Sequence, residues 1–184
     1  EGTSRLVLDV KVGSGAFMKT LHEARDLGQA LVGVASGYGV DCRALITDMS
    51  RPLGVAVGNA NEVREAIEVL RGGGPDDVRD LTLALAGDER AADVLASGAA
   101  FARFERMVEA QGGDPARLEE LLHVPEGIGV HVVEAPAAGI VQGVDAMGVA
   151  MAAFHLGAGR RRAEDAVDHG VGVDVHVRPG DRVE

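Results

Sequence analysis

The sequence is poor in aromatic residues, in cysteine and in lysine. Only 3% of its 184 residues are aromatic and none is tryptophan, whereas 46% are hydrophobic. A buried core must therefore be built from Ala, Val, Leu and Ile. The single cysteine, Cys42, excludes an intramolecular disulfide and a zinc site made of cysteines. It lies at the start of the apolar run over 42–47, which predicts a buried and unreactive thiol.

Positive charge is scarce as well. Lys and Arg total 18 against 29 Asp and Glu, so the formal net charge is −11. Such a surface repels nucleic acid and anionic membranes, because binding to phosphate backbones depends on Lys and Arg. The sequence also shows no signal-peptide pattern and no apolar run near the ~20 residues that cross a bilayer. We therefore expect a cytoplasmic protein without nucleic-acid or membrane partners.

A strand followed by a glycine-rich turn opens the chain. Residues 6–18 combine an apolar run with the turn at 13–15, and a helical pattern follows over 19–36. A second apolar run over 42–47 predicts a strand parallel to the first, because two strands joined through a helix form a βαβ unit. Ligands bind at the carboxyl ends of such strands. We therefore expect a binding site at this edge of the sheet.

Gly and Pro positions and apolar periodicity divide the rest of the chain. They predict a loop over 55–61, helices over 61–70 with Asn61 as the N-cap, 75–85, 89–111 with an interruption at Ser97 and Gly98, and 147–156, and strands over 128–134, 139–143 and 170–178. This pattern predicts an α/β part over 1–124 and a small α+β C-terminal lobe over 125–184, with the boundary near Pro125. Because both ends of the chain look abrupt, we expect a fragment of a longer protein.

Four blocks of the sequence resemble the thymidine and pyrimidine-nucleoside phosphorylases. They are DVKVGSGAFMKT at 9–20, ALITDMSRPLGVAVGNANEVREAIEVLRGGGPDDVRDLTLALA at 44–86, FERMVEAQGGDP at 104–115 and LGAGRRRAEDAVDHGVGV at 156–173. They occur in the right order and cover nearly the whole chain. The similarity is greatest to actinobacterial thymidine phosphorylases.

The resemblance implies a pentosyltransferase. The family cleaves pyrimidine nucleosides with inorganic phosphate, giving the free base and a pentose 1-phosphate, and we expect thymidine as the substrate with uridine as a second candidate. Members are homodimers with a helical domain, a larger α/β domain and a small β-rich lobe. This chain resembles the second half of that mixed or parallel α/β domain, flanked by helices, followed by the α+β lobe.

The family's phosphate-binding Lys-His-Ser-Thr-Gly-Gly segment has no counterpart in this sequence. The resemblance therefore implies that most of the catalytic groups lie elsewhere in the parent protein. We expect no catalytic residue within these 184 residues and no turnover from them alone.

The resemblance also places a substrate pocket at the end of the first strand. Phe17 aligns with an apolar residue that contacts the pyrimidine ring, and a flat apolar surface suits the face of a base. The alternative is that Phe17 caps the core at the strand end. The turn of Gly13, Ser14 and Gly15 could cradle phosphate with its amides, but in the family it forms a wall of the pocket.

Lys11 is the cation of this stretch that could face the substrate pocket. A lysine in a partly buried position rarely goes unpaired. We therefore favour an ion pair of Lys11 with Asp9 or Asp48 over direct contact with substrate.

A monovalent cation site, for K⁺, is the second feature that the resemblance implies. Leu53 and Ala56 would bind the ion through main-chain carbonyls, and Glu65 through its carboxylate, since hard cations prefer oxygen ligands. The alternative is that Glu65 is a solvated helix residue beside Arg64. No organic cofactor is expected.

Two other hypotheses compete with nucleoside phosphorolysis. Anthranilate phosphoribosyltransferases share the overall architecture, but they lack the blocks over 13–17 and 52–66 found in this sequence. The chain could instead be a non-catalytic structural or interaction fragment, because half a sheet should leave an exposed apolar face.

Overall fold

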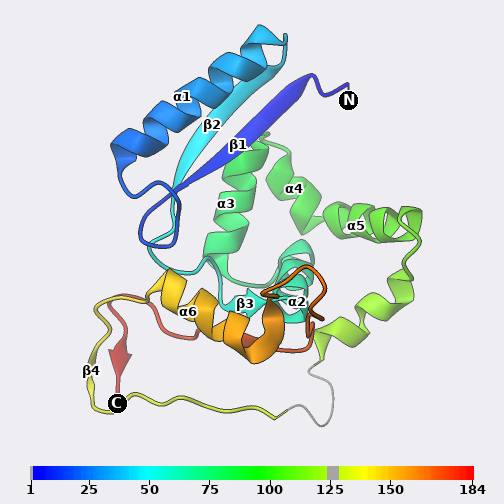
Figure 1. Ribbon diagram of the computed structural model, residues 1–184. Helices are drawn as coiled ribbons and strands as arrows, with labels where there is room; N and C mark the ends of the chain where they lie inside the picture. Colours follow the sequence, from blue (N-terminus) through cyan, green and yellow to red (C-terminus); the bar gives the residue numbers. More distant parts are fainter. Residues whose placement is uncertain (1, 124–128) are drawn as a thin grey trace.

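The computed structural model describes residues 2–123 and 129–184 (Figure 1). Its elements in chain order are β1 (Arg5–Val12), α1 (Leu21–Gly37), β2 (Asp41–Asp48), β3 (Ala56–Gly58), α2 (Ala60–Leu70), α3 (Asp76–Ala86), α4 (Ala91–Ala96), α5 (Ala99–Ala110), η1 (Pro115–Leu118), η2 (Glu120–Leu122), β4 (Gly139–Ile140), α6 (Ala146–Ala153), η3 (Phe154–Ala158), β5 (Gly172–Asp174) and β6 (Arg182–Val183). The predicted mixed α/β class is confirmed.

The first βαβ unit forms as predicted. β1 and β2 pair in parallel along their whole length, and Figure 1 shows them between α1 and α3. Val10 of β1 and Ala24 of α1 are buried on one side of the pair. On the α3 side, the Arg43 guanidinium donates to the Leu85 carbonyl at 2.7 Å. This bond satisfies a carbonyl of the last turn of α3, which has no partner within the helix.

The prediction of a simple loop over 55–61 is wrong. The chain forms β3 there, which pairs antiparallel with β5, so that Ala56 lies opposite Asp174. The predicted N-cap role of Asn61 is also wrong, because α2 begins one residue earlier. The Asn61 amide instead donates to the Asp174 carboxylate at 3.0 Å. A strand whose partner is so distant in sequence leaves no local pattern.

The C-terminal strands are shorter than predicted. The predicted strand over 139–143 is reduced to β4, which pairs with β6, and the one over 170–178 is reduced to β5. Residues 129–134 form no strand within the described chain, and Ile128 lies outside the described residues. Their β-branched side chains favour an extended backbone, but a strand also requires a hydrogen-bonded partner.

The predicted domain boundary near Pro125 lies outside the described residues, which omit 124–128. The division into 1–124 and 125–184 therefore stays a prediction. The described parts on either side are joined by the pairing of β3 with β5 and by a hydrogen bond of 2.8 Å from the Asn59 amide to the Ala158 carbonyl.

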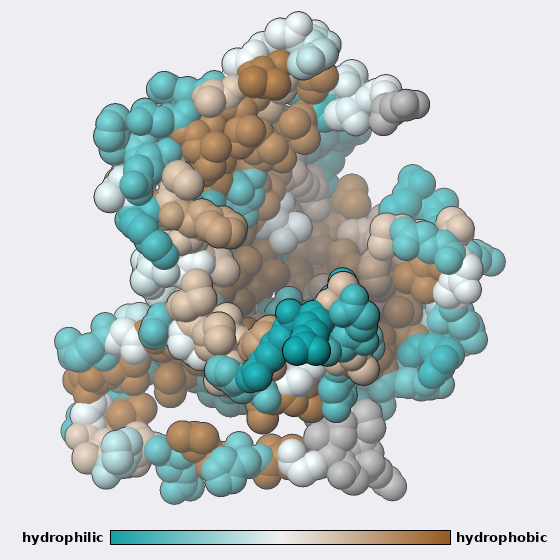
Figure 2. Space-filling model, in the orientation of Figure 1, coloured by the Kyte–Doolittle hydropathy of each residue, from teal (hydrophilic) through white to brown (hydrophobic). Residues whose placement is uncertain are grey.

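Several apolar side chains of α1 remain exposed. Leu27, Leu31 and Val34 recur there at helical spacing, and Figure 2 shows hydrophobic residues gathered over α1 and the neighbouring strands. Cys42, near the start of β2, is half-buried rather than buried as predicted. Among the described residues, no helix is both long enough and apolar enough to cross a membrane.

Ile67 on α2 should contribute more to stability than its helical neighbours. It is fully buried, at 0% exposure, whereas Val63 on the same helix is 40% exposed. We expect Ile67→Ala to lower the free energy of unfolding by about 2–5 kcal/mol, because the removed atoms leave a cavity. Urea unfolding of this variant beside Val63→Ala tests the prediction, and equal shifts of the midpoint would contradict it.

Candidate functional site

Two loops meet at the carboxyl ends of β1 and β2. The Phe17 loop, residues 13–19, leads from β1 to α1, and the Gly54 loop, residues 49–55, leads from β2 to β3. Parallel pairing brings both loops to one edge of the sheet. The Gly15 amide donates to the Met49 carbonyl at 2.9 Å, so the two loops are also bonded to each other.

Close packing explains the glycines of the predicted pocket wall. Gly13 has φ +130°, and a Cβ there would lie 2.7 Å from the Ser50 nitrogen. A Cβ at Gly15 would lie equally close, at 2.7 Å, to the Met49 carbonyl oxygen. The amides of Gly13 and Gly15 both donate to carbonyls of the protein, and the Ser14 hydroxyl donates to the Ser50 carbonyl at 3.1 Å. This use of the amides favours a wall over a phosphate cradle.

Phe17 projects from the loop into solvent. Its side chain is 98% exposed, while the preceding residue, Ala16, is buried. Phe17 therefore does not cap the core, which was the alternative to contact with a base. An exposed aromatic ring on an anchored loop offers a flat apolar face to a ligand. Contact with the pyrimidine ring stays a prediction.

Two polar groups that organise the Phe17 loop were missed from the sequence. The Lys19 ammonium donates to the carbonyls of Ser14 at 2.8 Å and Ala16 at 2.7 Å. Thr20 and Glu23 form a capping box at the start of α1. The Thr20 N–H, its hydroxyl and the Lys19 N–H lower the pKa of Glu23. The spacing Thr20-x-x-Glu23 could have predicted this cap, but nothing in the sequence indicates the role of Lys19.

Lys11 forms the expected ion pair. Its ammonium lies 2.7 Å from the Asp9 carboxylate, which also accepts a hydrogen bond from the Thr47 hydroxyl. Asp48, the other candidate partner, accepts the Ser50 N–H at 2.9 Å. Hydrogen bonds from the hydroxyl and N–H of Ser50 lower the pKa of Asp48. Lys11 thus reaches the site edge with its charge already paired.

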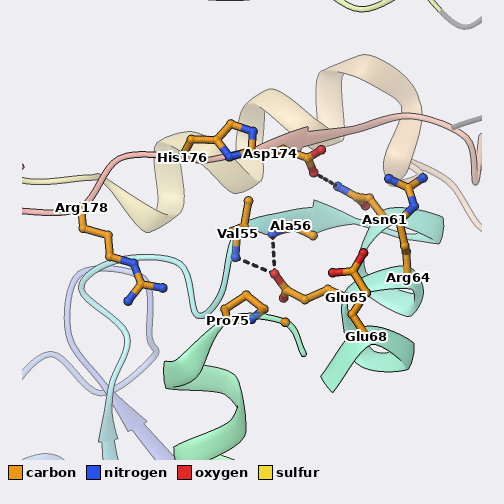
Figure 3. Close-up of a pocket in the computed structure, with 11 residues that line it drawn as sticks. Val55, Ala56, Asn61, Arg64, Glu65, Glu68, Pro75, Asp174, His176 and Arg178 are labelled. Atoms are coloured by element: carbon orange, nitrogen blue, oxygen red, sulfur yellow. Dashed lines mark hydrogen bonds between the residues drawn. The ribbon is translucent and has the colours of Figure 1, made fainter. Parts of the chain in front are cut away.

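Glu65 is not a solvated helix residue, so that alternative is wrong. Its carboxylate turns back from α2 onto the Gly54 loop and accepts the N–H groups of Val55 at 2.7 Å and Ala56 at 3.1 Å (Figure 3). Gly54, with φ +71°, has no room for a side chain, because a Cβ would overlap this carboxylate. The close approach of Glu65 therefore requires glycine at position 54.

The predicted cation ligands are brought together in part. The Val175 N–H donates to the Val55 carbonyl at 2.8 Å, so this carbonyl faces β5. In an antiparallel ladder the next residue points its polar groups away from the partner strand, and the Ala56 N–H donates to Glu65 there. Leu53 lies in the same loop, beside Gly54. Carbonyl and carboxylate oxygens are the ligands that a hard cation prefers, and the site stays a prediction.

Asp77, near the start of α3, binds three parts of the chain. Its carboxylate accepts hydrogen bonds from Arg51 at 2.8 Å, from Arg178 at 3.1 Å and from the Gly54 N–H at 3.4 Å, and its side chain is only 16% exposed. Burial raises the pKa of Asp77, but the Arg51 hydrogen bond, the Arg178 charge and the Gly54 N–H outweigh burial and lower it overall. Sequence reasoning missed Asp77, because Arg178 is distant in the chain.

A cavity of about 420 Å³ lies on the α2 side of the Gly54 loop (Figure 3). Figure 3 shows side chains of both charges around it, including Arg64, Glu65, Glu68, Asp174 and Arg178. No residue of the Phe17 loop lines this cavity. The predicted substrate wall is therefore not part of this cavity.

Comparison with known proteins gives consistent matches. The family model for the pyrimidine nucleoside phosphorylase C-terminal domain matches residues 140–184. Thymidine phosphorylase of Mycobacterium tuberculosis (strain ATCC 25618 / H37Rv) is 50% identical over 100% of this chain and 44% of the relative. Pyrimidine-nucleoside phosphorylase of Bacillus subtilis (strain 168) is 39% identical over 100% of this chain and 46% of the relative.

Over its whole length the chain is similar to thymidine and pyrimidine-nucleoside phosphorylases, and its C-terminal residues match the C-terminal domain of the pyrimidine nucleoside phosphorylases. The resemblance carried by the four sequence blocks is thereby confirmed. The chain spans a little under half the length of these relatives, 44% and 46%.

Gly54→Ala should disturb the Gly54 loop. The substitution places a Cβ against the Glu65 carboxylate at a φ of +71°. We expect the free energy of unfolding to fall by about 1–3 kcal/mol, the usual cost of such backbone strain. Gly33→Ala on α1 is the matched control, since no heavy atom lies within 4 Å of its Cβ position. Chemical denaturation measures the free energy of unfolding of both variants, and a Gly54→Ala protein as stable as Gly33→Ala would refute the prediction.

Asp77 should make stability depend on pH. A carboxylate whose folded pKa lies below its ordinary value of 3.8 stabilises the fold above that value, and this contribution is lost as pH falls through the lower folded pKa. At pH 7 we expect Asp77→Asn to lower the free energy of unfolding by about 1–3 kcal/mol, because two arginines lose a charged partner.

The Asp77→Asn deficit should shrink as pH falls from about 5 toward and below 3.8. Asp76→Asn is the control, because Asp76 is the adjacent residue and its side chain is 77% exposed. Urea titrations at several pH values measure both. A deficit that stays constant with pH would show that the Asp77 charge is not what stabilises the loop.

Proposed function

We propose that the complete protein cleaves pyrimidine nucleosides with inorganic phosphate, releasing the base and a pentose 1-phosphate. Thymidine is the favoured substrate and uridine the second. The relatives named thymidine phosphorylase and pyrimidine-nucleoside phosphorylase support this reaction. The structural observation that carries it is Phe17, 98% exposed on a loop anchored at the sheet edge where ligands bind.

Phosphorolysis of a nucleoside requires orientation and charge stabilisation more than covalent help. The C–N bond loosens toward an oxocarbenium-like sugar while phosphate approaches, and negative charge develops on the departing base. In our proposal Phe17 packs against the face of the base. The wall of Gly13, Ser14 and Gly15 limits how far the base can move, because it is bonded to the neighbouring loop.

The described cations of these two loops and of β1 are already engaged. Lys11 pairs with Asp9, Lys19 binds two loop carbonyls, and Arg51 pairs with Asp77. Phosphate and the charge on the base both need positive groups. We therefore propose that these groups come from parts of the complete protein outside this chain, and that this chain contributes pocket walls rather than a catalytic residue.

A potassium ion is the inorganic group that we propose for the Gly54 loop. The Leu53 and Ala56 carbonyls and the Glu65 carboxylate would hold it. The bound ion would supply positive charge that orders these oxygens. Glu65 orders the same loop through its bonds to two amides.

Assembly and location follow from the family resemblance. We propose a homodimer that works in the cytoplasm.

Chromatography of the reaction products tests the proposed function. The complete protein should release thymine from thymidine, and uracil from uridine, only when phosphate is present, with sulfate as the ionic control. No phosphate-dependent release from either nucleoside would overturn the proposal. The 184-residue chain, assayed alone, should show no turnover. Turnover by this chain would instead refute our placement of the phosphate-binding groups outside it.

A further inference from the structure

The Lys19 ammonium donates hydrogen bonds to the backbone of its own loop, the Phe17 loop. Its Nζ atom lies 2.8 Å from the Ser14 carbonyl oxygen and 2.7 Å from the Ala16 carbonyl oxygen. These two carbonyls belong to the residues that lead into Phe17. A lysine ammonium has three donors, so two of them are directed at the loop backbone. The bonds fix where the chain turns outward to expose the ring.

This arrangement is separate from the cap of α1. The first turn of the helix is closed by Thr20 and Glu23, which form a capping box through their side chains and backbone N–H groups. The Lys19 side chain contributes nothing to that box; only its backbone N–H bonds to Glu23. Loss of the Lys19 ammonium should therefore leave the helix start intact while it frees the loop.

The far side of the loop is anchored by other groups. The Gly15 N–H and the Ser14 hydroxyl bond to the Gly54 loop, and Ala16 is buried. Between these anchors and α1, the Lys19 ammonium is the side-chain group that binds the loop backbone next to Phe17. Backbone bonds from Gly13 to Met18 and from Ala16 to Gly13 also close the loop, and the Lys19 ammonium is the charged side chain that adds to them beside Phe17.

We propose that Lys19 is a positioning residue for nucleoside binding, which holds Phe17 in place to receive the base. The inference rests on the proposed function and deepens it, because it names what sets affinity for the base. A loop ordered before binding loses less conformational entropy when the ligand arrives. Lys19 acts through Phe17 and touches neither phosphate nor the reacting bond.

The test compares variants of the complete protein. Lys19→Met keeps the aliphatic stem and removes the donors, Lys19→Arg restores donors, and Phe17→Ala removes the ring. Arg25→Met, at an exposed position of α1, is the matched control for loss of a positive charge. Hydrogen exchange of the amides over 14–18 reports loop order. Steady-state kinetics report the KM for thymidine, the KM for phosphate and kcat separately.

We expect Lys19→Met to speed exchange over 14–18 and to raise the thymidine KM about three- to tenfold, the effect of reordering a short loop. The phosphate KM and kcat should stay within about twofold. Lys19→Arg should bring the exchange rate and the thymidine KM most of the way back to the wild-type values, and Arg25→Met should change neither quantity. Phe17→Ala should raise the thymidine KM without faster exchange at 14–16.

Three results would overturn the inference. They are unchanged exchange in Lys19→Met, faster exchange with an unchanged thymidine KM, and an increase of the phosphate KM in place of the thymidine KM, which would make Lys19 a phosphate ligand. If the wild-type protein shows no phosphate-dependent release, the proposed function fails and the base-binding role of Lys19 fails with it. In that case the exchange comparison still decides whether Lys19 orders the loop.

Discussion

Parallel pairing of β1 with β2 brings two loops to one edge of the sheet, and the polar contacts of the site follow from that geometry. Strands that run in register from Arg5 and Asp41 end together at Val12 and Asp48. The loops that follow the two strands therefore begin side by side. Glycine at position 13 allows this approach, because a side chain there would collide with Ser50. The Phe17 loop and the Gly54 loop consequently form one bonded unit.

Carboxylates hold this unit together. They are in excess in this chain, which has a net charge of −11. Glu65 accepts the N–H groups of Val55 in the Gly54 loop and of Ala56 at the start of β3, and Asp77 accepts the Gly54 N–H and two arginines. Hydrogen bonds to charged acceptors are stronger than those between neutral groups. Because Arg178 belongs to the segment after β5, the C-terminal part of the chain also helps to hold the loop. A binding surface at this edge therefore depends on residues from three separate stretches of sequence.

The sequence predicted those parts of the fold whose cause is local. The βαβ unit, α3 and the break between α4 and α5 at Ser97 and Gly98 all follow from periodicity, caps and glycine turns. The pairing of β3 with β5 could not be predicted, since it depends on contacts between distant segments. Residues 129–134 show the converse error, where β-branched composition indicated a strand that finds no described partner. At the site, the resemblance identified Phe17 and Glu65, but not the role of Lys19 or Asp77, which act through contacts that leave no sequence motif.

An exposed phenylalanine is notable in a chain with only 3% aromatic residues. Leaving such a ring in water forfeits about 1.5–3 kcal/mol relative to burying it. Phe17 is 98% exposed, while the backbone that leads into it is held by the buried Ala16 and by two carbonyls bonded to Lys19. The hydrophobic free energy is instead available to whatever covers the ring. A base bound against Phe17 would gain that energy without first having to order the loop, so affinity for the base and rigidity of the loop should rise and fall together.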